Sequence, residues 1–94
     1  MQTTPVISIT TLWEGASAQE IETDVVEPQE QRLGNLTGLL QMTSESAAGQ
    51  GVVRLEFATG TRIADARTEV DLKLAEVPGY PEGVLNPGVL LGET

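Results

Sequence analysis

The sequence predicts an α+β fold, a ferredoxin-like βαββαβ sandwich in which two helices cover one face of an antiparallel sheet. Three observations support this prediction. First, the pattern of two alternating segments with a helical segment between them occurs twice along the chain. Second, each helical segment has a single apolar stripe. Third, turns that contain Gly or Pro separate the segments. Because each helix has one apolar side, both helices must pack on a common sheet. The length of 94 residues is enough for one domain.

The first predicted element is a strand over residues 6–13, which is rich in β-branched residues and alternates between two faces. One face carries Ile7, Ile9, Thr11 and Trp13, and the other carries Val6, Ser8, Thr10 and Leu12. The first face is apolar enough to bury, and the second is mixed. Trp13 is therefore expected in the core rather than on a binding surface.

The second element is a helix that begins after Ser17, which forms a capping box with Glu20. Its apolar sector contains Ala18, Ile21, Val25, Val26, Pro28 and Leu33. Its acidic face is expected to be solvated rather than to bind a cation, because no loop supplies the carbonyl ligands that calcium prefers. Pro28 is expected to kink the helix without ending it, because the apolar sector continues through Leu33.

A hairpin follows, with strands expected over residues 39–44 and 52–57. Gly34 and Gly38 end the preceding helix, and residues 47–51 form the loop between the strands. The second strand alternates clearly between an apolar and a mixed face. Its apolar face carries Val53, Leu55 and Phe57, and its other face carries Val52, Arg54 and Glu56.

The last two elements are a helix over about residues 62–77 and a strand within residues 84–91. The helix buries a stripe of Ile63, Ala66, Val70, Leu74 and Val77. Two i,i+4 pairs are expected on its flanks, Arg67 with Asp71 and Glu69 with Lys73. Pro87 limits the final segment to an edge position in the sheet.

Composition excludes several classes of function. There are 5 basic and 14 acidic residues, and the net charge of -9 opposes binding to nucleic acid. The chain has no Cys and no His, so it lacks the usual zinc ligands and cannot assemble a Ser-His nucleophile. We therefore predict no metal site, no cofactor and no enzymatic activity. The longest apolar run near the C-terminus is far shorter than the ~20 residues of a membrane span, and the N-terminus has no signal-peptide pattern.

Several motifs along the chain resemble one known family. Ser44 to Gly49 reads Ser-Glu-Ser-Ala-Ala-Gly, the strand at 52–57 ends in Phe, and a Gly-Thr turn follows at residues 60–61. The second helix contains Glu-Val-Asp-Leu-Lys-Leu at residues 69–74, and the first strand leads into Trp-Glu-Gly-Ala at residues 13–16. In this order and spacing they resemble the first periplasmic porter subdomain of the resistance-nodulation-division efflux transporters. The resemblance covers nearly the whole chain.

The resemblance implies a single porter-type subdomain, residues 1–94, excised from a larger membrane transporter. In that family a transmembrane helix precedes the first strand, and the acids of the proton relay lie in transmembrane helices. This domain would therefore be the periplasmic portion of an inner-membrane protein and would do no chemistry itself. The implied partners are the remainder of the transporter, two further copies in a homotrimer, a periplasmic adaptor and an outer-membrane channel.

The resemblance also implies two functional surfaces. The sheet face away from the helices would line the substrate cleft, with Ser8, Thr10, Thr43, Val52 and Arg54 at the matching positions. Arg54 departs from the neutral residues that are common there, which leaves anionic or amphiphilic substrates open. The outer side of the second helix would line a central pore between protomers, with Ala64, Thr68, Leu72 and Ala75 as contacts. The ordinary alternatives are a solvated sheet and an exposed helix face.

A second class of function fits the same fold prediction. Ferredoxin-like sandwiches of this size also occur as free-standing small-molecule-binding or regulatory modules. A metal-binding module is disfavoured because Cys and His are absent. The sequence thus leaves a transporter subdomain and a free-standing binding module as the two hypotheses.

Overall fold

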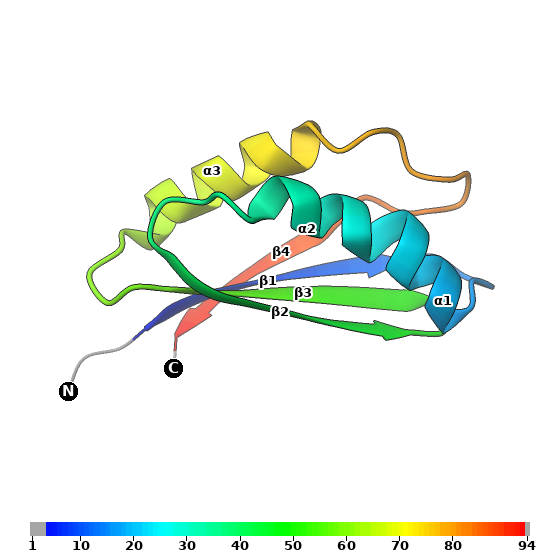
Figure 1. Cartoon of the computed structure of the whole chain (residues 1–94), viewed down its shortest axis with the longest axis horizontal. Helices are drawn as coiled ribbons and strands as arrows, with labels where there is room; N and C mark the ends of the chain where they lie inside the picture. The colour runs from blue at the N-terminus through cyan, green and yellow to red at the C-terminus, as the bar shows by residue number, and fades with distance from the viewer. Residues whose placement is uncertain (1–3, 94) are drawn as a thin grey trace.

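Four strands form one antiparallel sheet in the order β2-β3-β1-β4, and the helices lie together on one side of it (Figure 1). In this computed structural model, which describes residues 4–93, the strands are β1 Pro5–Leu12, β2 Leu39–Ala47, β3 Gln50–Phe57 and β4 Gly88–Glu93. The helical segments are α1 Ala18–Ile21, η1 Glu22–Val26, α2 Glu27–Leu33 and α3 Ile63–Ala75. The predicted ferredoxin-like α+β sandwich is confirmed. Residues 1–3 and 94 of the expected domain lie outside the described range.

The core lies between the helices and the sheet. Strand β1 is central and pairs with both β3 and β4, so its side chains on the helix side are enclosed. The apolar strand residues that are fully buried on that side are Ile7, Ile9, Val53, Leu55 and Phe57. These residues are the ones that the alternating pattern assigned to the apolar face. Trp13 is partly buried and packs against the same core, as expected.

The first helix is continuous from Ala18 to Leu33, but its middle turn is a π-helix. Its start has the expected capping box, with the Glu20 amide donating to Ser17 Oγ at 3.1 Å and the Ser17 amide donating to Glu20 Oε1 at 3.0 Å. Pro28 has no N–H to donate to the carbonyl four residues earlier. Just before it, the Glu27 amide reaches the Glu22 carbonyl five residues back. The prediction that Pro28 does not end the helix is confirmed, and a π turn accommodates it.

The first helix approaches the sheet most closely at Gly51. A Cβ atom on Gly51 would lie 2.8 Å from Ile21 Cγ2 and 2.9 Å from Val26 Cγ2. Gly51 belongs to β3 rather than to the hairpin loop, because residues 48–49 alone make the turn. Gly49 has φ +79°, a conformation that glycine adopts easily. Both hairpin strands are therefore longer than expected, and the missing side chain at Gly51 lets the helix pack directly on the strand.

Helix α3 packs through Ala66 and Val70, which are buried, and through Leu74, which is partly buried. Arg67 Nε lies 3.7 Å from Asp71 Oδ2, which confirms one of the two expected ion pairs. The other pair was wrong, because Lys73 Nζ lies 4.0 Å from Glu76 Oε2 and the Glu69 carboxylate accepts hydrogen bonds from Thr37. Exposed pairs of this kind contribute little to stability.

Two polar residues, Thr11 and Gln29, are buried in the core of the described part of the chain. Gln29 is 1% exposed, and its Nε2 donates to Thr11 Oγ1 at 2.9 Å and to the Tyr80 hydroxyl at 3.1 Å. Gln29 Oε1 is buried without a hydrogen-bond partner among the described residues. The network joins α2, β1 and the connection between α3 and β4. Within residues 4–93, the helices are all too short or too polar to cross a bilayer.

Candidate functional site

The sheet face away from the helices gathers all five residues expected in the substrate cleft. Antiparallel register places partners on the same face, so the strands form rows across the sheet. One row contains Thr43, Arg54, Ser8 and Leu90, on β2, β3, β1 and β4. The next contains Glu45, Val52, Thr10 and Gly88. The structure thus brings the expected residues together, and adds Leu90 and Glu45, which the sequence did not single out.

This face is hollowed around Arg54 and Thr43. One hollow of about 220 Å³ is lined by Gln41, Thr43, Arg54 and Glu56. A second, of about 430 Å³, is lined by Ser8, Thr43, Ser44, Glu45, Val52 and Arg54. Because Thr43 and Arg54 line both hollows, they lie at the centre of the concave part of the face. The volume of the second hollow is within the usual range for small-molecule sites, roughly 300–1,000 Å³, and that of the first is below it.

The Ser-x-Ser motif on β2 has a structural role on the opposite face. Ser44 Oγ donates to Glu30 Oε2 at 3.1 Å, and Ser46 Oγ donates to Glu22 Oε2 at 2.6 Å. Two carboxylates of the first helix thereby hold the edge strand β2. Part of the acidic helix face is therefore bonded to the sheet rather than only solvated. The motif thus joins the first helix to β2, and the hydroxyl hydrogens of both serines are used in these two bonds.

The outer line of α3 is exposed as expected. Ala64, Thr68, Leu72 and Ala75 are all exposed, and Leu72 is 63% exposed. The Thr68 hydroxyl donates to the Ala64 carbonyl at 3.0 Å within the helix. Because the Thr68 hydroxyl hydrogen is used in this bond within the helix, the outer side of α3 presents mainly small apolar side chains and one large one, Leu72.

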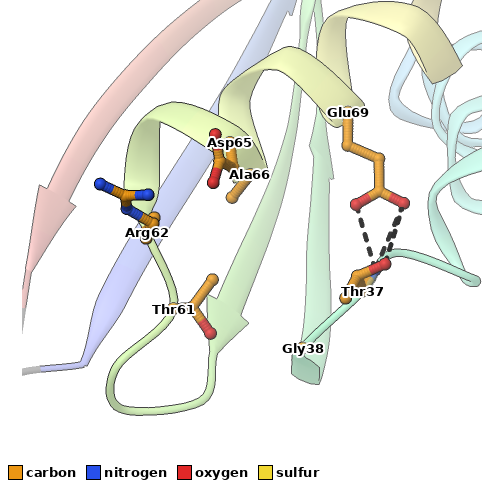
Figure 2. Close-up of a pocket in the computed structure, with 7 residues that line it drawn as sticks. All are labelled: Thr37, Gly38, Thr61, Arg62, Asp65, Ala66 and Glu69. Carbon is orange, nitrogen blue, oxygen red and sulfur yellow. Dashed lines mark hydrogen bonds between the residues drawn. The ribbon is translucent and has the colours of Figure 1, made fainter.

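A third hollow, of about 230 Å³, lies where the α2–β2 connection meets α3 (Figure 2). Figure 2 shows the Glu69 carboxylate directed at Thr37, whose amide lies 3.2 Å from Oε1 and whose hydroxyl lies 3.4 Å from Oε2. Gly38, the next residue on the same connection, has φ +79°, and a Cβ there would lie 2.9 Å from Thr61 Oγ1. This hollow is a junction between loops, and we assign it a structural role.

Replacing Glu69 with Ala should weaken this junction. Loss of the charged acceptor leaves the Thr37 amide to water, and the expected cost is about 1 kcal/mol of unfolding free energy because the site is partly exposed. Urea denaturation measures the change, and backbone amide exchange at Thr37 should accelerate. The matched control is Glu76→Ala, whose ion pair with Lys73 is exposed and should cost less than about 0.5 kcal/mol. Equal effects of the two changes would contradict this role.

Comparisons with known proteins match nearly the whole chain to one family of proteins. The model of the AcrB/AcrD/AcrF family matches residues 2–93. The multidrug resistance protein MdtF of Escherichia coli strain K12 is 39% identical over 88 residues, which are 90% of this chain and 8% of MdtF. MdtF of Escherichia coli O157:H7 gives the same values.

Among solved structures, a heavy metal efflux pump in its crystal form II has the same fold, with a TM-score of 0.81 over 89% of this chain and 9% of the pump. Its sequence identity of 21% supports a likeness of fold alone. The chain spans less than a tenth of the length of these relatives.

Proposed function

This chain belongs to the AcrB/AcrD/AcrF family, and on that premise we propose that it is the periplasmic pore or porter subdomain of a proton-driven efflux transporter. The domain contributes substrate-cleft surface and trimer contacts and performs no catalysis itself. Its partners are the rest of the transporter, two further copies in a homotrimer, a periplasmic adaptor and an outer-membrane channel. The match over residues 2–93 supports the resemblance to the resistance-nodulation-division transporters along nearly the whole chain.

The observation that carries the cleft assignment is the concave, polar sheet face. The helices pack on the other side of the sheet (Figure 1), so this face is open to a neighbouring part of the transporter or to a substrate. Thr43 and Arg54 are exposed, and Ser8, Thr10 and Val52 are half-buried. A surface that combines hydroxyl groups, one cation and aliphatic side chains can contact substrates of different shapes.

Cysteine labelling at Thr43 tests both the periplasmic location and the cleft. The chain contains no Cys, so Thr43→Cys introduces its only thiol. In a full-length transporter without other cysteines, a membrane-impermeant maleimide added from the periplasmic side should label this thiol. The bulky adduct should then lower dye efflux several-fold, because it fills the hollow around Arg54.

The control is Asp24→Cys, at an exposed position on the outer side of the first helix. The same reagent should label it without reducing efflux. Failure to label either thiol from the periplasmic side contradicts the location, and equal loss of efflux after labelling of both contradicts the cleft assignment.

A further inference from the structure

Arg54 lies on the open sheet face with its charge unpaired within the described residues. The ion pairs of residues 4–93 join Arg67 to Asp71 and Lys73 to Glu76, and both are on or next to α3. Arg54 is exposed and forms no side-chain hydrogen bond in that range. A guanidinium has five N–H donors in a planar fork that matches the oxygens of a carboxylate, sulfate or phosphate group. The Arg54 guanidinium therefore has N–H donors that could bind an anion and that the contacts of the fold leave unused.

Two hydroxyl groups flank this guanidinium. The register places Ser8 of β1 opposite Arg54 on one side and Thr43 of β2 opposite it on the other. Directly opposed residues have Cβ atoms about 4.5–5.5 Å apart, so both hydroxyls are within reach of a group bound to Arg54. Three neighbouring side chains can thus donate to one small set of oxygen atoms.

Nearby carboxylates limit the charge of such a group. Glu56 follows Arg54 by two residues on the same face of β3, and Glu45 lies opposite Val52 in the next row. The whole chain has a net charge of -9. These charges repel a group with several negative charges, such as a phosphate cluster or nucleic acid. Among anionic ligands, one with a single negative charge therefore experiences the least repulsion.

An apolar contact lies farther along the same row. Leu90 is opposite Ser8, is 71% exposed, and stands on the open face between Gly88 and Gly92. It is two strands from Arg54, or about 10 Å at the usual spacing between strands. The two glycines leave room on both sides of Leu90. An apolar group that extends from Arg54 across Ser8 therefore reaches exposed aliphatic surface.

We propose that the row Thr43, Arg54, Ser8 and Leu90 binds amphiphiles with one negative charge, an inference that rests on the proposed role of this face as substrate surface. The anionic head accepts hydrogen bonds from Arg54 and the two hydroxyls, and an apolar body about 10 Å long covers Leu90. Arg54 then determines specificity by favouring anionic over cationic amphiphiles. Because the rest of the chain attracts cations, this preference must come from the face itself.

The probe is octyl sulfate, titrated below its micelle-forming concentration into the 94-residue chain while backbone amide shifts are followed by NMR. The amides of Ser8, Thr43 and Arg54 are expected to shift. Arg54→Gln should weaken binding by about tenfold or more, because it removes a charge-assisted bond. Leu90→Ala should weaken it roughly threefold to tenfold, because less apolar surface is buried. Octyltrimethylammonium should bind this face more weakly than octyl sulfate.

Two matched controls use residues of the same type elsewhere. Arg32→Gln removes an exposed arginine of α2, and Leu72→Ala removes an exposed leucine of α3. Both should leave the affinity for octyl sulfate within about twofold. The assignment is overturned if octyl sulfate does not bind the wild-type face, if Arg54→Gln and Arg32→Gln act equally, or if the cationic probe binds the face more tightly. Those results would not affect the Thr43 labelling experiment, which measures access and efflux rather than charge preference.

Discussion

Gly51→Val is expected to lower the free energy of unfolding by about 3 kcal/mol. Strands normally favour valine over glycine, so propensity alone predicts a gain in stability. At Gly51, however, even a Cβ would lie within 2.9 Å of two methyl groups, Ile21 Cγ2 and Val26 Cγ2. The added methyls would force the first helix away from β3 and disturb the core that it covers. A domain of this size has only about 5–15 kcal/mol of stability, so the loss is a large fraction.

Urea denaturation followed by the fluorescence of Trp13, the single tryptophan, measures the change. The control is Gly79→Val, because a Cβ at Gly79 would meet no atom within 4 Å. That variant should stay within about 0.5 kcal/mol of the wild type. If Gly51→Val proves as stable as Gly79→Val, the close approach of helix and strand is not a packing constraint.

Leu72→Glu is expected to abolish export by the full transporter while leaving the isolated domain folded. Leu72 is 63% exposed, so the change should alter the unfolding free energy of the 94-residue chain by less than about 0.5 kcal/mol. In the proposed trimer the same change places three carboxylates around one axis. Repulsion between them is several-fold stronger at an interface of low dielectric than in water.

Leu74→Glu, two residues farther along α3, is the contrasting variant. Leu74 is partly buried against the core, and a charge there should destabilise the isolated chain by about 3 kcal/mol. Dye efflux, expression level and urea denaturation together separate the two effects. If Leu72→Glu unfolds the isolated chain, Leu72 belongs to the core. Normal efflux by a Leu72→Glu transporter would exclude the pore-lining contact.

Much of the fold could be predicted because local pattern and tertiary packing agree. Alternation along β1 and β3 identified the buried faces correctly, since both are central strands with one covered side. The capping box also followed directly from the spacing of Ser17 and Glu20. The same alternation placed Ser8, Thr10, Val52 and Arg54 on one face. Periodicity is informative wherever a segment has one buried and one open side.

Features that depend on contacts distant in sequence could not be predicted in the same way. Gln29 falls within the apolar sector of the first helix, which was the available signal, but its burial depends on Thr11 and on Tyr80, 51 residues away. The partner of Glu69 proved to be Thr37 from another segment rather than Lys73 on its own helix. Leu90 gained its place beside Ser8 only through the β1–β4 register.

The pairing of β1 with β4 has a mechanical consequence. Pro5 at the start of β1 lies opposite Glu93 at the end of β4, so the first residue of the sheet and its last residue lie side by side at one corner of the domain. Any polypeptide that continues from both ends is joined to the domain at that single corner. A body held in this way can swing as one piece, with only two adjacent backbone connections absorbing the rotation. A rotation about this attachment would then move the face around Arg54 farther than the attachment itself, because that face lies away from the corner.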